Sequence, residues 1–239
     1  MNLTNKVAVV TGAGSGLGAS IAEALINKGA SVFGIARNQD ALKRIHTKLG
    51  DKFTPVQLDI TDQEAITSWV KNTLSNTHAP DILVNNAGIG GFAKIDTMQS
   101  DDWLNMINTN LNGMYFITSQ IVPLLKSNKN VTHIVNIGSI LGTMGREEGT
   151  AYCTTKYGVS GFSDALYKEL RLYKIKVTCI NPGSIETGFF QSSGINPHEN
   201  MLHPADVADT IIHVLETPDN LLINELTLRP LNPKEPKQI

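Results

Sequence analysis

The sequence has only two cysteines, Cys153 and Cys179, and their spacing fits neither a metal site nor a redox motif. We therefore expect both thiols to be buried and reduced. Lysine and arginine (20) nearly balance aspartate and glutamate (22), and neither sign is concentrated, which argues against a nucleic-acid groove or an anionic membrane as partner. No apolar run is long enough to span a membrane, and the N-terminus lacks the pattern of a secretion signal. The composition predicts a soluble, cytoplasmic protein without a metal.

Linkers, internal repeats and low-complexity segments are missing as well. With 239 residues, of which 41% are hydrophobic, the chain can build one large core, and α/β folds of this size are commonly a single unit. We therefore expect one domain over residues 1–239. Two segments differ from the rest: 184–203 lacks clean periodicity and is expected to be a substrate-binding loop, and the polar tail 232–239 is expected to fray.

A glycine-rich loop follows the first apolar run of the chain. Val7 to Val10 is the kind of short apolar run that forms a strand buried on both faces of a sheet. After it come Gly12, Gly16 and Gly18, and apolar residues then recur at helical spacing as far as Gly29. Strand, glycine loop and helix N-terminus together form a site for a pyrophosphate, because bare backbone and free N–H groups face the anion. A simple tight turn is the competing interpretation.

Apolar runs and amphipathic stretches alternate along the rest of the chain. Strands are expected at residues 31–36, 53–58, 82–84, 133–138, 176–180 and 221–228, and helices at 39–49, 62–74, 101–126, 152–172 and from 204 onward. The helix 101–126, capped by Ser100 or Asp101, carries poor helix formers in its middle (Asn108, Asn110, Asn112 and Gly113). They predict either a solvated face or a distortion that exposes a backbone carbonyl. Pro123 is expected to bend the last turns.

Two strand ends indicate how an adenosine would be held. Arg37 closes the second strand about twenty residues beyond the glycines, where a dinucleotide-binding unit meets the adenosine ribose. An acid there would bind the 2′-hydroxyl, whereas an arginine favours a 2′-phosphate; a solvated surface arginine is the alternative. Asp59, next to Ile60 at the end of the third strand, either accepts from an adenine amino group or caps a turn.

Tyr152 and Lys156 are spaced i, i+4 at the start of a predicted helix, so both side chains lie on one face of it. A nearby ammonium favours the ionised phenol, so we expect Lys156 to lower the pKa of Tyr152 and make it a usable acid and base near neutrality. Ser139, after the fifth apolar run, could hold the same substrate oxygen through its hydroxyl. A Tyr-x-x-x-Lys pair is common by chance, and a half-buried ring beside a solvated amine is the plain alternative.

The candidate residues come in one fixed order: Thr11-Gly12-x-x-x-Gly16-x-Gly18, Asp59, Asn86-Ala87-Gly88, Asn110, Ser139, Tyr152-x-x-x-Lys156, Pro182-Gly183 and Thr187. In this order and spacing the chain resembles the short-chain dehydrogenase/reductase family over essentially its full length. Residues 202–208 and 222–230 look like the branch that contains 3-hydroxy acid and serine-type dehydrogenases and general carbonyl reductases. The resemblance implies a Rossmann-type, doubly wound α/β fold with a seven-stranded parallel sheet and helices on both faces.

The resemblance also implies an oxidoreductase that moves a hydride between a nicotinamide cofactor and a carbonyl or secondary alcohol. Tyr152 would be the general acid and base, with Ser139 and Lys156 beside it, and Asn110 would hold a water that links Lys156 to solvent. The implied cofactor-binding set is Gly12, Ser15, Gly16, Leu17, Gly18, Arg37, Asp59, Ile60, Asn86, Ala87, Gly88, Tyr152, Lys156, Pro182, Gly183, Ile185 and Thr187. Arg37 favours NADP(H); NAD(H) is possible, because Ser15 stands where NADPH-preferring members often have a basic residue.

Partners and alternatives complete the expectations. The resemblance implies a small-molecule substrate and a homodimer or homotetramer that pairs through the helices beginning near Asp101 and Tyr152. Arg146, between Ser139 and Tyr152, is the one candidate contact for an acidic or polar substrate, with surface solvation as the alternative. Two other functions remain open: a lyase or epimerase on the same fold, and a non-catalytic sensor that binds NADP(H).

Overall fold

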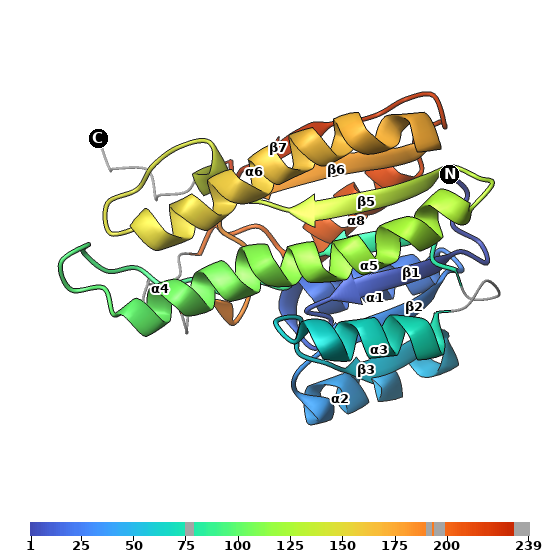
Figure 1. Ribbon diagram of the computed structural model, residues 1–239, viewed down its shortest axis with the longest axis horizontal. Coiled ribbons are helices and arrows are strands. Elements are labelled where there is room, and N and C mark those ends of the chain that lie inside the picture. Colours follow the sequence, from blue (N-terminus) through green and yellow to red (C-terminus); the bar gives the residue numbers. More distant parts are fainter. Residues whose placement is uncertain (75–78, 190–192, 194–198, 232–239) are drawn as a thin grey trace.

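The computed structural model describes residues 1–74, 79–189, 193 and 199–231 (Figure 1). One sheet of seven parallel strands has the order β3-β2-β1-β4-β5-β6-β7. The strands are β1 (Val7–Thr11), β2 (Ser31–Ala36), β3 (Phe53–Gln57), β4 (Ile82–Asn85), β5 (Thr132–Ile137), β6 (Ile175–Pro182) and β7 (Glu225–Leu228). The chain starts in the middle of the sheet, winds out to β3, returns to β4 and continues to β7. This is the expected doubly wound, Rossmann-type arrangement.

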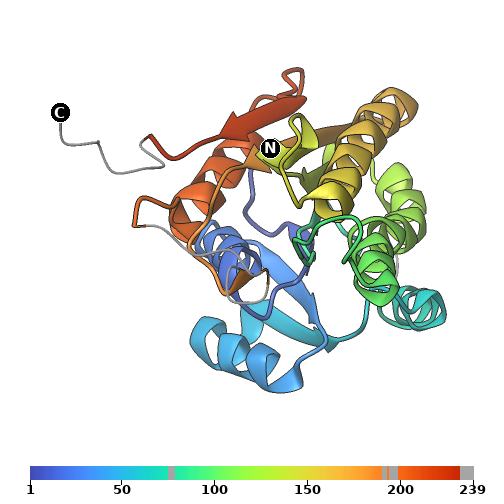
Figure 2. The same ribbon diagram turned by 90° about the vertical axis from the view of Figure 1, so that its left-hand side faces the viewer.

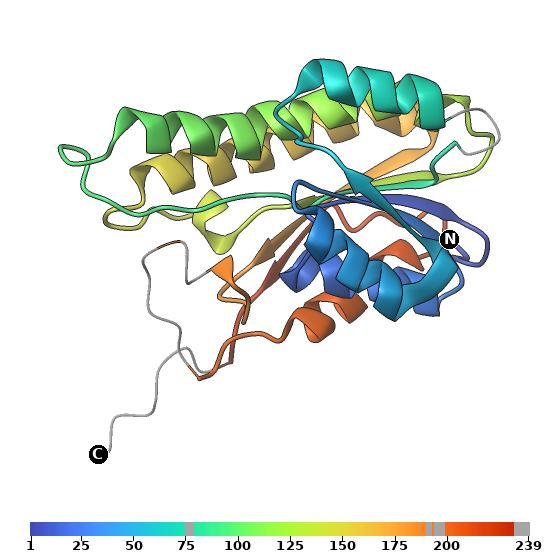
Figure 3. The same cartoon turned by 90° about the horizontal axis from the view of Figure 1, so that it is seen from below.

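Helices cover both faces of the sheet (Figures 2 and 3). One layer consists of α1 (Gly16–Asn27), α2 (Gln39–Leu49) and α8 (Pro204–Leu215). The other consists of α3 (Gln63–Thr73), α4 (Ser100–Ile107), α5 (Met114–Ser127) and α6 (Thr150–Leu170). Short 3₁₀ turns occupy Gly50–Lys52, Ile140–Gly142 and Arg171–Tyr173. In the part of the chain that the structure describes, no helix is long and apolar enough to cross a membrane.

Each helical layer buries its own apolar cluster against the sheet. In the first layer, Leu25 of α1 and Ile211 of α8 are fully buried together with residues of β1. In the second layer, Ile117 of α5 and Leu170 of α6 pack on the opposite face of the same strands. Fully burying such a side chain stabilises the fold by about 1.5–3 kcal/mol. The two clusters therefore hold the strand ends, and the loops that leave them, in fixed positions.

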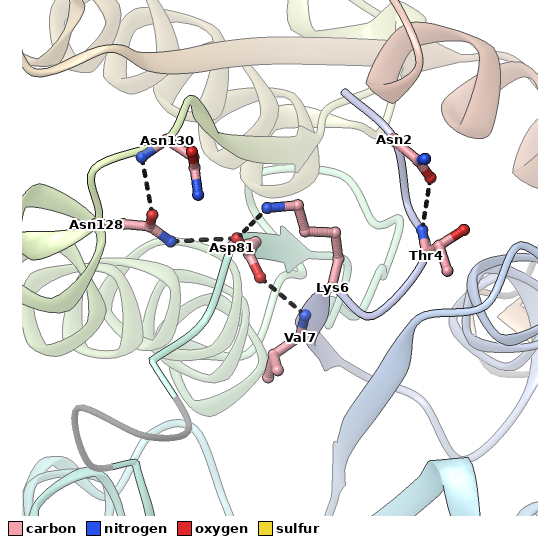
Figure 4. A network of polar contacts seen from close by, with 7 residues as sticks. All are labelled: Asn2, Thr4, Lys6, Val7, Asp81, Asn128 and Asn130. Carbon is pink, nitrogen blue, oxygen red and sulfur yellow. Dashed lines mark hydrogen bonds and ion pairs between the residues drawn. The ribbon is translucent and has the colours of Figure 1, made fainter.

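Asp81 fastens the edge of the sheet where the strands begin (Figure 4). Its carboxylate forms an ion pair with Lys6 (2.7 Å) and accepts a hydrogen bond from the backbone N–H of Val7 (3.0 Å). The side-chain amide of Asn128, after α5, donates to the same carboxylate (3.1 Å). One buried acid thus ties the starts of β1 and β4 to the end of a helix.

The sequence prediction places several boundaries differently from the structure. β7 begins at Glu225 rather than at Leu221, because Leu221 closes a turn by donating its N–H to the carbonyl of Pro218 (2.9 Å). Asn224, the residue before β7, already bonds to β6, because its carbonyl accepts from the backbone N–H of Cys179 (3.0 Å). α6 begins at Thr150 and ends at Leu170, two residues earlier at each end than predicted.

The helix predicted over residues 101–126 is interrupted in its middle. It starts at Ser100, with Gln99 as a cap that makes no side-chain hydrogen bond, so neither predicted capping residue acts as one. From Asn108 to Gly113 the chain forms a π-helix, and α5 then continues through Pro123 to Ser127. Of the two alternatives that the asparagine cluster left open, a solvated face or a distortion, the structure shows a distortion. The polar tail 232–239 and much of the loop 184–203 lie outside the described residues.

Candidate active site

The carboxyl ends of the parallel strands meet at one edge of the sheet, which faces the viewer in Figure 2. The end of β1 is fixed by Thr11, whose hydroxyl accepts hydrogen bonds from the backbone N–H groups of Asn86 and Ala87 (3.0 Å each). The side-chain amide of Asn86 donates back to the carbonyl of Thr11 (2.9 Å). Sequence reasoning named Thr11 only as part of a motif; in the structure it joins the glycine loop to the end of β4.

Close packing explains the glycines of the loop. Gly12 has a positive φ of 69°, and a Cβ there would lie 2.8 Å from the amide nitrogen of Asn86. A Cβ on Gly18 would lie 2.2 Å from the carbonyl oxygen of Gly12. Ser15 precedes α1 without a side-chain cap, and the first turn of α1 carries no acid. Uncapped N–H groups behind bare backbone fit a pyrophosphate, so the loop suits a dinucleotide.

Arg37 and Asp59 lie together at the ends of β2 and β3. The guanidinium is 3.9 Å from the carboxylate, and the Arg37 side chain is 69% exposed. Asp59 also accepts from the backbone N–H and the hydroxyl of Thr61 (2.9 and 2.8 Å), so its capping role is present in the structure. Ile60 uses its buried side chain for packing, because a Cβ on Gly113 would lie 2.8 Å from it. Arg37 is left exposed enough to meet a second anion.

Ser139, Tyr152 and Lys156 come together at the end of β5. The hydroxyl of Ser139 accepts from the backbone N–H of Leu141 (3.1 Å) and lies close enough to the phenol of Tyr152 to lower the pKa of that phenol. The ammonium of Lys156 lies 5.7 Å from the centre of the Tyr152 ring and donates to the carbonyl of Ile137 (2.9 Å). All three side chains are buried. The sequence pattern therefore places a phenol, a hydroxyl and an amine in one small volume.

The pKa of Tyr152 differs from the sequence expectation. Burial raises the pKa of the phenol to about 12, and the nearby hydroxyl of Ser139 offsets this rise only in part. Burial likewise lowers the pKa of the Lys156 ammonium to about 8. The expectation that the pKa of Tyr152 is lowered was wrong, because the effect of burial dominates. The spacing i, i+4 indicates that the groups share a helix face, but it does not indicate how completely both are removed from water.

Asn110 lies in the π-helix, and its side chain is fully engaged with the protein. Its oxygen accepts from the backbone N–H of Ile89 (2.9 Å), and its amide nitrogen donates to the carbonyl of Ile89 (2.8 Å) and to the hydroxyl of Thr155 (3.0 Å). The amide therefore braces the segment after β4 against α6. Gly88 lies between Asn110 and Lys156: a Cβ there would be 3.3 Å from the Asn110 oxygen and 3.9 Å from the Lys156 nitrogen.

The segment that follows β6 lies next to the glycine loop. Gly183 donates its N–H to the carbonyl of Leu228 (2.7 Å), which holds the Pro182–Gly183 turn at the end of β6. Ile185 pairs with Leu202 in an isolated bridge. The methyl group of Thr187 would be 3.1 Å from a Cβ on Gly16. The predicted nicotinamide-binding residues and the predicted pyrophosphate loop thus lie side by side.

Aromatic rings flank Tyr152 on two sides. The ring of Phe92 is 5.4 Å and the ring of Phe189 is 5.6 Å from that of Tyr152, measured between ring centres. The Phe189 ring fills the space where Gly90 has no side chain. Arg146 stacks its guanidinium over Phe92 at 4.8 Å. Sequence reasoning missed both phenylalanines, because nothing in their local pattern connects them to residue 152.

Comparison with known proteins finds similar sequences and structures over most of the chain. The family model described as short chain dehydrogenase matches residues 6–197. An uncharacterized oxidoreductase of Staphylococcus aureus (strain N315) is 35% identical over 231 residues, which cover 96% of this chain and 99% of that protein.

Two solved structures are similar to nearly the whole chain, each with a TM-score of 0.88. One is the closed form of serine dehydrogenase complexed with NADP⁺, 31% identical, with 93% of this chain and 94% of that chain covered. The other is 3-ketoacyl-(acyl-carrier-protein) reductase from Brucella melitensis complexed with NADH, 29% identical, with 95% and 98% covered.

Proposed function

The chain belongs to the short-chain dehydrogenase family, and on this premise we propose that it is an oxidoreductase that interconverts a carbonyl compound and a secondary alcohol, using a nicotinamide dinucleotide. The observation that carries the proposal is the meeting of Ser139, Tyr152 and Lys156 next to a glycine loop that suits a pyrophosphate. No feature of the described residues favours the lyase or the sensor alternative over this one.

The chemistry follows from the site's own groups. A bound nicotinamide supplies or accepts the hydride. Tyr152 gives its proton to the oxygen of a carbonyl substrate, or takes one from an alcohol, and Ser139 holds the same oxygen by a hydrogen bond. Because burial raises the pKa of Tyr152 to about 12, the phenol is protonated at neutral pH, as carbonyl reduction requires. The positive charge of Lys156 stabilises the phenolate that remains after the transfer.

Replacement of the phenol is the direct test. We expect Tyr152→Phe to lower kcat/KM by about 100- to 10,000-fold, because the proton donor is lost, while the dissociation constant of NADPH changes little. Tyr167→Phe, on the same helix but away from the site, is the matched control and should keep its activity. The assay is NADPH or NADH turnover over a panel of ketones, quinones, and 3-oxo and 3-hydroxy acids. Full turnover by Tyr152→Phe would refute the proposal, and tight NADPH binding without turnover by the unaltered protein would favour the sensor.

We propose NADP(H) as the preferred cofactor because Arg37 presents an exposed guanidinium at the end of β2. A charge-assisted hydrogen bond to a 2′-phosphate contributes about 1.5–3 kcal/mol, which corresponds to roughly a 10- to 100-fold preference. Arg37→Ala should reduce the ratio of kcat/KM for NADPH over NADH by about that factor, and Arg44→Ala on the exposed face of α2 should not. An unchanged ratio in Arg37→Ala would assign NADP(H) recognition elsewhere or exclude it.

For the substrate, we propose a carbonyl compound with an acidic group attached to an apolar body. Arg146 lies over Phe92, whose ring contacts that of Tyr152, and it makes no ion pair within the described part of the chain. An acid and its methyl ester should therefore respond differently to Arg146→Ala: kcat/KM falls for the acid and stays constant for the ester. An equal loss for both, or none, contradicts the contact.

A further inference from the structure

Asn181 connects the candidate catalytic serine to the outermost strand of the sheet. It lies near the end of β6 and has no exposed surface (0%). Its side-chain oxygen accepts a hydrogen bond from the backbone N–H of Ser139 (3.2 Å) and a second from the thiol of Cys179 (3.4 Å). Its side-chain nitrogen donates to a carboxylate oxygen of Glu225 on β7 (2.6 Å). Through one amide, Glu225 and Ser139 are linked across β6.

The partners fix which way this amide points. The backbone N–H of Ser139 can only donate, so the amide oxygen of Asn181 must face it. The thiol of Cys179 can donate or accept, and it donates to the same oxygen. An ionised carboxylate can only accept, so the amide nitrogen must face Glu225. Glu225 therefore selects the orientation in which Asn181 can hold Ser139. A hydrogen bond to a charged acceptor is about twice as strong as one between neutral groups, which makes this selection effective.

Gly138 allows the close approach that this contact needs. A Cβ on Gly138 would lie 2.0 Å from the Asn181 oxygen, so any other residue there would displace the amide. Gly138 itself donates its N–H to the carbonyl of Ile180 (2.7 Å). The backbone at residues 138 and 139 is thus held to β6 by two consecutive hydrogen bonds after β5 has ended at Ile137.

We propose that Asn181 and Glu225 are positioning residues for Ser139. Glu225 orients the amide of Asn181, and Asn181 holds the backbone of Ser139 so that its hydroxyl meets the phenol of Tyr152. The kinetic consequences rest on the proposed function, since they require that Ser139 takes part in turnover. The structural consequence, a fixed amide at Ser139, does not depend on it.

An exchange of roles between the two side chains is the sharpest test. Asn181→Asp keeps an oxygen for Ser139 but faces the carboxylate of Glu225 with a second one, and we expect kcat to fall by about 10-fold or more while KM for NADPH stays constant. Adding Glu225→Gln to that variant restores a donor opposite an acceptor, and kcat should return to within about 3-fold of the unaltered protein. Glu225→Gln alone still offers an acceptor and should change kcat little. A double variant no more active than Asn181→Asp would overturn the proposal.

Two further measurements separate positioning from a merely structural role. In a Ser139→Ala background, Asn181→Asp should cause no additional loss of kcat, because the hydroxyl it positions is already absent. Hydrogen exchange of the Ser139 amide should accelerate in Asn181→Asp and return in the double variant, and this readout needs no substrate. Exchange that stays slow in Asn181→Asp overturns the proposal whether or not the protein reduces carbonyls. Asp164→Asn, which removes an exposed carboxylate on α6, controls for the change of charge and should alter neither measurement.

Discussion

His133 is a fully buried histidine on β5 whose ring has one hydrogen-bond partner among the residues that the structure describes. Its Nε2 lies 2.8 Å from the hydroxyl of Thr178, which in turn donates to the carbonyl of Ile223 (2.6 Å). Because that hydroxyl has given its hydrogen away, Nε2 carries the proton, and Nδ1 is left buried without a partner. Burial lowers the pKa of His133 to about 3, with the positive charges of Lys176 and the Met1 amine acting in the same direction.

This low pKa predicts acid sensitivity. In the unfolded chain the imidazole binds a proton below about pH 6.5, whereas in the folded protein it stays neutral down to about pH 3. Stability is therefore present above pH 6.5 and is lost as the pH falls, by up to about 1.4 kcal/mol per pH unit from this residue. Denaturant unfolding at pH 7, 6 and 5 should show a shallower loss for His133→Val than for the unaltered protein.

Ile134→Val, at the next position of β5, provides the control for that comparison, because it alters the buried core without removing a titratable group. It should leave the pH slope of the unfolding free energy as it is in the unaltered protein. Equal slopes for His133→Val and the unaltered protein would show that His133 does not govern the acid response.

At the residue scale, the spacing of the motif predicted which side chains come together at the site, but not how far they are buried. Tyr152 and Lys156 share a helix face, and Ser139 ends beside them, because a four-residue offset and a strand end can be identified in the sequence. The sign of the Tyr152 pKa shift could not be predicted, since it depends on side chains from distant segments that exclude water. Two hydrogen bonds were not predicted for the same reason. Asn110 bonds to Thr155 and Asn181 bonds to Glu225, and each bond joins residues more than forty positions apart.

At the scale of elements, the bounds were predicted best where a turn or capping residue separates two elements. The bounds of β2 (Ser31–Ala36) and α2 (Gln39–Leu49) match the prediction, because Asn38 separates them and caps α2 by accepting from the N–H of Ala41 (2.9 Å). The start of β7 was wrong, since an apolar run before Glu225 resembles a strand although a turn holds its first residue. Pairing with β6, and not local sequence, decides where that strand begins.

The π-helix lies where the sequence has residues that are unfavourable in an α-helix. Asparagines and a glycine are poor helix formers, and between Asn108 and Gly113 the helix departs from α geometry. The sequence did not indicate which contacts the irregular turn makes. In the structure, Asn110 reaches Ile89 and Thr155 from the irregular turn, and so connects two neighbouring elements at the site.

At the scale of the whole molecule, the doubly wound, seven-stranded parallel sheet was predicted from the family resemblance and not from periodicity, and the order of its strands was not predicted. Alternating strands and helices indicate parallel strands, but the return from β3 to β4 beside β1 is a long-range choice. The confirmed Rossmann-type fold fixes the crevice at the carboxyl ends of β1 and β4, where the chain reverses direction across the sheet. The glycine loop therefore had to lie there once the fold was known.

We predict that the molecule pairs with a second copy through the outer face of α4, α5 and α6. Leu104, Tyr115 and Tyr157 are large apolar or aromatic side chains on these helices with 51%, 54% and 49% of their surface exposed. Burial of such rings drives association. Tyr157→Asp should lower the mass found by sedimentation velocity, whereas Tyr173→Asp, equally exposed but on the turn after α6, should not. A monomeric unaltered protein would contradict the prediction.

The fastening around Asp81 lies at the edge of the sheet opposite the reacting groups. We expect the Lys6–Asp81–Asn128 contacts to contribute to the free energy of unfolding and not to turnover, because they share no side chain with the proposed catalytic residues. Substitutions that weaken these contacts should therefore lower the melting temperature while the catalytic constants stay the same.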